Sequence, residues 1–159
     1  MSIENAKAHL KKWGADTRVL EFEVSSATVE LAAAAVGCEG ARIAKTLSFK
    51  DPDGAAFLIV CAGDGKVDNR KFKDFFGFKA KMLAFEEVEE LVGHGVGGVC
   101  PFGIKDSVKV YLDESLRRFE TVYPAAGGSN TAIELNMDEL FEYSGALQWI
   151  DICKLPETE

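Results

Sequence analysis

Residues 42–62 read RIAKTLSFKDPDGAAFLIVCA, and this stretch decides the fold. Residues 42–50 alternate polar and apolar side chains, as a β-strand with one solvated face does. Residues 51–54, Asp-Pro-Asp-Gly, have the composition of a tight turn. Residues 56–62 are apolar throughout, as in a central strand. The stretch therefore predicts a β-hairpin in the middle of a sheet.

The segments on both sides of this hairpin alternate between helical and extended patterns. Helices are predicted over 3–13, over a segment capped by Ser25 or Ser26, after Asp68 or Asn69, over 85–92 and after Asn136. Strands are predicted over 18–24, 79–83, 107–113, 120–126, 131–135 and 149–153. This order predicts an α/β fold, a single domain over 1–159 with a mixed, largely antiparallel sheet curled toward a barrel and surrounded by helices.

Lys45 interrupts the apolar side of the first strand, which is otherwise formed by Ile43, Leu47 and Phe49. Its ammonium group must either reach solvent at the strand end or line a pocket that holds an anionic partner. The residues alone leave both interpretations open.

Residues 93–103 read GHGVGGVCPFG, with five glycines and one proline. This composition excludes a helix or a central strand, and it can turn several backbone N–H groups toward one anion or developing oxyanion. An ordinary surface turn is the alternative. The spacing Gly93-x-Gly95-x-x-Gly98 matches the dinucleotide-binding fingerprint, but a predicted helix precedes it and extended chain follows. That order excludes the fingerprint.

The bulk composition is that of an ordinary soluble protein of 17.3 kDa with a formal net charge of −8. It contains no apolar run of the roughly 18 residues that a membrane span needs, and no signal-peptide pattern at its start, which favours a cytoplasmic location. The four cysteines form no C-x-x-C pair and the two histidines lie far apart, so we expect no metal and no other cofactor.

The negative charge argues against a protein that follows a long phosphate backbone. The exception is a basic run over 66–81, made of Lys66, Arg70, Lys71, Lys73, Lys79 and Lys81. This run either meets a few phosphates or forms a solvated helix face.

Two motifs, IAKTL at 43–47 and GGVCPFG at 97–103, resemble those of the YbaK and prolyl-tRNA-synthetase-associated editing domains. GKVD at 65–68 and GGSN at 127–130, followed by IEL at 133–135, extend the resemblance over about residues 3 to 153. It implies a free-standing, metal-independent trans-editing enzyme that hydrolyses the ester between a wrong amino acid and the 3′ end of tRNA. The implied partners are the acceptor end of mischarged tRNA and an aminoacyl-tRNA synthetase, with no membrane and no DNA.

The resemblance also implies a site. Lys45 would lie near the terminal ribose-phosphate or the aminoacyl group, and its ammonium would face the loop amides across a hollow sized for an esterified adenosine. The residues implied for the ester and its oxyanion are Gly97, Gly98, Val99 and Cys100. The residues implied for other substrate contacts are His94, Pro101, Phe102, Gly103, Gly128, Ser129 and Asn130.

Two alternatives remain open on the sequence. One is a non-catalytic module that binds an aminoacyl or nucleotide group at the tRNA 3′ end. The other is a cysteine hydrolase that uses Cys100, for which the sequence offers no identifiable partner base.

Overall fold

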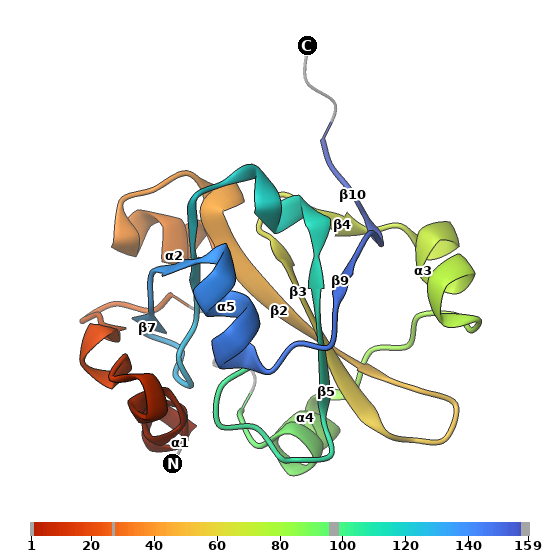
Figure 1. The fold of residues 1–159 in the computed structure, drawn as a ribbon, viewed down its shortest axis with the longest axis horizontal. Helices are drawn as coiled ribbons and strands as arrows, with labels where there is room; N and C mark the ends of the chain where they lie inside the picture. The colour runs from red at the N-terminus through yellow and green to blue at the C-terminus, as the bar shows by residue number, and fades with distance from the viewer. Residues whose placement is uncertain (1, 27, 96–98, 157–159) are drawn as a thin grey trace.

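The structure, a computed structural model, describes residues 2–26, 28–95 and 99–156. At its centre β2 (Ile43–Lys50) and β3 (Ala56–Ala62) form an antiparallel hairpin, paired from Ala44 with Ala62 to Lys50 with Ala56. The hairpin predicted from residues 42–62 is confirmed, and it forms the middle of a six-stranded sheet (Figure 1).

The other strands of this sheet extend it on both sides in the order β8-β6-β2-β3-β5-β9. The pairs β2–β6, β3–β5 and β5–β9 are parallel, and β6–β8 is antiparallel. The strands are β5 (Lys109–Asp113), β6 (Thr121–Pro124), β8 (Leu135–Asn136) and β9 (Trp149–Ile150). The predicted mixed sheet is confirmed, with a larger parallel share than the sequence had indicated.

Two short ribbons lie beside the main sheet. One pairs β1 (Leu20–Glu21) with β7 (Thr131–Ala132), and the other pairs β4 (Lys66–Val67) with β10 (Cys153–Lys154). Both ribbons are antiparallel. They tie segments that are far apart in the sequence to the edges of the fold.

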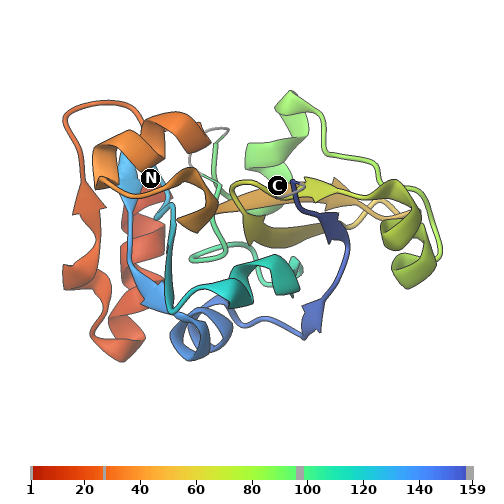
Figure 2. The same ribbon diagram turned by 90° about the horizontal axis from the view of Figure 1, so that it is seen from above.

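The described α-helices surround the sheet, with α3 at the end of the molecule opposite α1 and α2 (Figures 1 and 2). They are α1 (Ser2–Leu10), α2 (Val29–Val36), α3 (Asn69–Phe76), α4 (Phe85–Val92) and α5 (Met137–Ser144). Asp68 and Asn136 cap α3 and α5 as predicted, because their side chains accept the otherwise unpaired N–H groups of the first turn.

Several predicted boundaries differ from those observed. The cap of α2 is Thr28, whose hydroxyl accepts the Leu31 N–H, and not Ser25 or Ser26. The strand predicted over 18–24 is reduced to β1, because its partner β7 offers only two residues. The helix predicted over 3–13 ends at Leu10 and continues as a 3-10 turn to Trp13.

Three other predicted strands are also shortened or divided. Residues 79–83 touch β2 through a single bridge between Met82 and Phe49. The segment 149–153 divides into β9 and β10, which pair with different strands, and the segment 131–135 contains only β7 and the first residue of β8. Strand length is set by the partner, which a single segment does not reveal.

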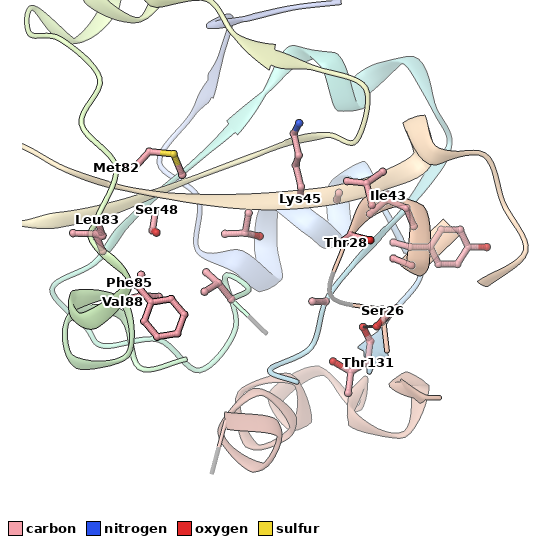
Figure 3. A pocket seen from close by; sticks show the side chains of 18 residues that line it. Ser26, Thr28, Ile43, Lys45, Ser48, Met82, Leu83, Phe85, Val88 and Thr131 are labelled. Carbon is pink, nitrogen blue, oxygen red and sulfur yellow. Dashed lines mark hydrogen bonds between the residues drawn. The ribbon is translucent and has the colours of Figure 1, made fainter. Parts of the chain in front are cut away.

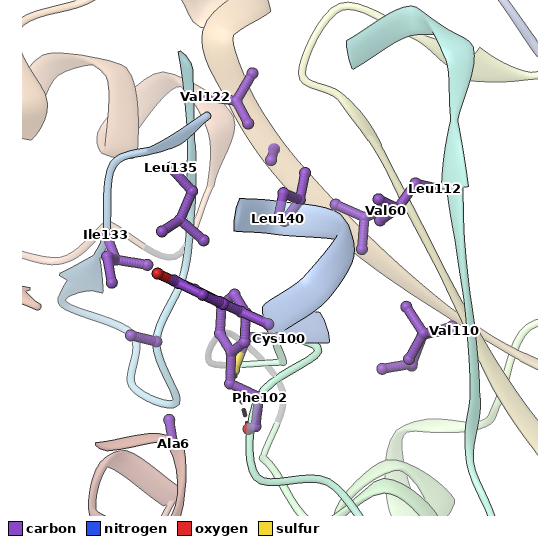
Figure 4. Close-up of a cluster of buried hydrophobic side chains, with 14 of the residues drawn as sticks. Ala6, Val60, Cys100, Phe102, Val110, Leu112, Val122, Ile133, Leu135 and Leu140 are labelled. Carbon is purple, nitrogen blue, oxygen red and sulfur yellow. Dashed lines mark hydrogen bonds between the residues drawn. The ribbon is translucent and has the colours of Figure 1, made fainter. Parts of the chain in front are cut away.

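The hairpin separates two cores. Leu58, Val60 and Ala62 face the larger core, which includes Ala6 of α1, Leu140 of α5 and Phe102 (Figure 4). Phe57, Ile59 and Cys61 face the opposite way, into the second core. This core contains a cluster of phenylalanine rings around α3, made of Phe49, Phe57, Phe72, Phe76 and Phe78. β3 is therefore buried on both faces, as its uninterrupted apolar sequence predicts.

Gly103, the last residue of the glycine-rich segment, packs closely against the backbone of α1. Its φ is +70°, and a Cβ at this position would lie 2.4 Å from the carbonyl oxygen of Asn5. Gly14 has nearly the same φ, +69°, but a Cβ there would meet nothing within 4 Å. The two glycines thus share the backbone requirement and differ in the close approach.

We expect Gly103→Ala to lower the free energy of unfolding by about 3–5 kcal/mol, and Gly14→Ala by only about 1–2 kcal/mol. Both variants introduce an L-residue into the left-handed region, but only the first also forces Asn5 away. Urea unfolding followed by circular dichroism measures both values. Equal losses would show that the contact between Gly103 and α1 does not constrain the fold.

Candidate functional site

A cavity of about 330 Å³ opens on one side of β2 (Figure 3). Its wall comes from the start of α2, residues 43–46 and Ser48 of β2, the segment from Met82 to Val88, Val99, and the stretch from β6 to β7. Most of this wall is apolar. Such a cavity suits a small ligand that is fixed in place by a few polar contacts.

Hydroxyl groups supply much of the polar character of the wall, and they come from Ser26, Thr28, Thr46, Ser48, Tyr123 and Thr131. Three of these already have partners, because Ser26 Oγ donates to the Ser129 carbonyl, Thr28 caps α2 and Thr131 Oγ1 accepts the Ala126 N–H. Thr46 Oγ1 is buried and has no hydrogen-bond partner among the described residues. An unpaired buried hydroxyl costs free energy, so Thr46 keeps hydrogen-bonding capacity next to the cavity.

Lys45 is one of the residues that line the cavity, and Figure 3 shows its side chain on the opposite side of the β2 ribbon from Ser48. Its Nζ donates to the carbonyl oxygen of Gly65, 2.5 Å away, in the loop that follows β3. It shares this face of β2 with Leu47 and Phe49, as the alternation predicted. The expected arrangement, with the ammonium facing the amides of residues 97–100 across a hollow, stays a prediction, because Gly97 and Gly98 lie outside the described residues.

The glycine-rich segment contributes to the cavity through Val99. Gly97 and Gly98, predicted to bind the ester, lie outside the described residues. Cys100, Pro101 and Phe102 are buried, and Phe102 belongs to the larger core. With Gly103 against α1, the stretch 100–103 lies behind the cavity wall and does not form it.

His94 and Cys100 meet in the interior, a contact that the sequence did not indicate. Cys100 Sγ lies 3.5 Å from His94 Nε2, and His94 Nε2 donates to the Phe102 carbonyl oxygen at 2.5 Å. Both side chains are fully buried and neither lines the cavity.

Burial sets the protonation of this pair. It raises the pKa of the Cys100 thiol to about 12 and lowers the pKa of the His94 imidazole. Desolvation thus favours the neutral form of both groups, whereas a reactive cysteine needs a thiolate. The contact is that of a structural pair and not of a nucleophile with its base.

The turn that contains Gly128, Ser129 and Asn130 holds the segment before α2. The Ser129 carbonyl accepts the Ser26 N–H, and Asn130 Nδ2 donates to the Phe22 carbonyl. A Cβ on Gly128 would lie 2.7 Å from the side chain of Ile3 in α1. These residues support the cavity wall from behind, whereas the adjacent Thr131, which the sequence did not single out, lines the cavity.

Comparison with known proteins identifies the family to which this chain belongs. The family model for the aminoacyl-tRNA editing domain matches residues 23–143, which include the hairpin, the glycine-rich segment and the cavity wall. The chain belongs to the aminoacyl-tRNA editing domain family. The resemblance inferred from the two motifs is confirmed.

Individual relatives of this editing domain differ in how much of their length it covers. It is 52% identical to Uncharacterized protein YwhH of Bacillus subtilis (strain 168), over 97% of this chain and 98% of the relative. It is 28% identical to a proline–tRNA ligase of Thermosipho melanesiensis, over 79% of this chain but 22% of that protein. A solved structure provisionally assigned as a trans-editing enzyme for prolyl-tRNA synthetase superposes with a TM-score of 0.86 at 32% identity, covering 96% of this chain and 97% of the other.

Within residues 2–26, 28–95 and 99–156, no three His, Cys, Asp or Glu side chains gather where they could hold a metal ion. None of the helices in the described ranges is both long and apolar enough to span a bilayer.

We expect Cys100 of the editing domain to resist alkylation by iodoacetamide at pH 8 in the folded protein, because its thiol is fully buried and its pKa is near 12. Cys38, which is partly exposed, should react first. Mass spectrometry of the digested protein identifies the labelled thiols, and labelling in urea provides the control. Rapid labelling of Cys100 in the native state, with loss of activity, would restore the cysteine-hydrolase alternative.

Proposed function

We propose that the protein is a free-standing trans-editing hydrolase that cleaves the aminoacyl ester of mischarged tRNA. The observation that carries the proposal is the small, mostly apolar cavity, lined by hydroxyls and by Val99 of the glycine-rich segment, in a member of the editing domain family. The solved structure assigned to trans-editing and the proline–tRNA ligases among the relatives support tRNA as the substrate.

The reaction needs a positioned water molecule and donors for the tetrahedral oxyanion. Val99 lines the cavity, and its N–H donates to no acceptor within the described residues. In the proposal this N–H, together with those of Gly97 and Gly98, binds the oxyanion. One such donor is typically worth about 3 kcal/mol of the barrier.

An aminoacyl ester is already activated, so a held water molecule and aligned donors can suffice without a strong base. The hydroxyls of Thr46 and Ser48 are on the cavity side of β2 and are placed to orient such a water. This division of labour requires no ionised side chain inside the cavity. It is compatible with the buried, neutral state of His94 and Cys100.

Lys45 enters the proposal as an anchor for an anionic group of the substrate. β6 pairs with β2 only at Ile43 and Ala44, and the bridge to Met82 is at Phe49, so no strand of the described residues pairs with this edge of β2 between these contacts. The lysine stem is long and flexible, and among the residues that the structure describes its ammonium donates only to a neutral carbonyl. A phosphate accepts a stronger, charge-assisted bond, so we propose that Lys45 exchanges Gly65 for the substrate across this edge.

The experiment that tests the function is incubation of the purified protein with a panel of tRNAs. Because the cavity is small, we expect release of small amino acids such as alanine or serine from mischarged tRNAPro, and no release from correctly charged prolyl-tRNAPro. Free amino acid is measured over time against a no-enzyme control. Binding of mischarged tRNA without release would instead favour the non-catalytic module.

We expect Lys45→Ala to lower kcat/KM for deacylation about 10- to 100-fold, the worth of one hydrogen bond to a charged group. The fold should survive, because the substitution removes a single hydrogen bond to Gly65. Lys45→Arg, which keeps the cation, is the matched variant and should retain more activity than Lys45→Ala. Near-normal turnover by a folded Lys45→Ala protein would remove Lys45 from the mechanism.

A further inference from the structure

Among the described residues, Phe85 has the most exposed large apolar side chain, at 73% of its full accessible surface. It is the first residue of α4, and its ring projects from the helix toward the cavity (Figure 3). No ring contact of Phe85 with another aromatic side chain occurs within the described part of the chain, whereas the phenylalanines around α3 pack against one another. The faces of this ring are therefore accessible at the mouth of the site.

Neighbouring side chains make the rim around Phe85 apolar. Met82 also lines the cavity and is 55% exposed, and Val88 lies one turn further along α4 with its side chain buried. A single exposed apolar residue is common on protein surfaces, but an aromatic ring and a methionine that share the border of a cavity mark a binding surface.

Charges of both signs lie next to this apolar rim, because Glu86 and Glu87 of the first turn of α4 stand beside two lysines. Lys50 forms an ion pair with Glu87 in the first turn of α4, and Lys81 immediately precedes Met82. Both ammonium groups lower the pKa of the Glu87 carboxyl, Lys50 through a direct hydrogen bond, so both lie near the start of α4. A ligand with a flat apolar ring and a nearby phosphate complements this combination.

We propose that Phe85 is a stacking platform for the terminal adenine base of the tRNA acceptor end. The inference rests on the proposed function, which brings an esterified adenosine to the cavity. A volume of about 330 Å³ is at the lower end of the 300–1,000 Å³ typical of ligand pockets, so it takes the amino acid and the ester and leaves the base at the rim. There the ring of Phe85 covers one face of the base, and Lys81 meets the phosphate on its 5′ side.

The test measures the coupling between Phe85 and the base. The probes are two acceptor-stem minihelices with alanine attached through a non-hydrolysable amide, one ending in adenosine and the other in an abasic sugar. For the wild-type protein we expect removal of the base to weaken binding on the order of tenfold, the worth of one base–aromatic stack. Phe85→Ala should weaken binding of the adenosine probe by the same factor and make the protein insensitive to loss of the base.

Two matched variants complete the design. Phe85→Tyr keeps the ring and should behave like the wild type, whereas Phe75→Ala removes an exposed phenylalanine from α3, remote from the cavity, and should change neither affinity. Losses from base removal and from Phe85→Ala that simply add would overturn the proposal, as would the absence of binding by any probe. Hydrolysis of the charged tRNAs in the panel by the protein is measured separately. A failed stacking site and a failed deacylase assignment therefore give different results.

Discussion

The register between β2 and β3 is the constraint on which both the core and the candidate site depend. It places Lys45 opposite Cys61, Leu47 opposite Ile59 and Phe49 opposite Phe57. The side chains of Leu47, Phe49, Phe57 and Ile59 lie in the phenylalanine-rich core, while Ala44, Thr46 and Ser48 on the other face are small. The cavity exists because small residues occupy that face. A slip of one residue would exchange the two faces, filling the cavity and exposing the core.

Local signals predicted the parts of the fold that are locally determined. The turn at 51–54, the caps at Asp68 and Asn136 and the terminating glycines each specify a backbone conformation without help from distant residues. The strand predicted over 18–24 and the one over 79–83 depend on partners elsewhere in the chain, and each pairs with its partner over one or two residues only. Propensity identified extended chain correctly there but could not set its length.

The candidate site shows the same division. Alternation predicted on which side of β2 Lys45 would lie, but its hydrogen-bond partner, the Gly65 carbonyl, belongs to a loop that only the tertiary structure brings close. Glycine is needed wherever backbone must approach closely, whether to a ligand or to a helix. Gly103 approaches α1. A sequence motif does not show whether such a glycine contacts a helix or a substrate. Thr131 lacked any signal, because its position on the cavity wall depends on how β7 pairs with β1.

The placement of chemical groups separates affinity from selectivity in the proposed reaction. Contacts at the rim bind parts that every charged tRNA shares, so they strengthen binding to correct and incorrect substrates alike and do not discriminate. Discrimination must then come from the cavity. An apolar pocket distinguishes one methylene by only about 1–3 kcal/mol of binding free energy, so it rejects a smaller amino acid weakly. A larger amino acid is excluded more strongly, because the pocket lacks the space for it. A cavity built from small residues of β2 and rigid secondary structure is therefore suited to removing amino acids smaller than the one it spares.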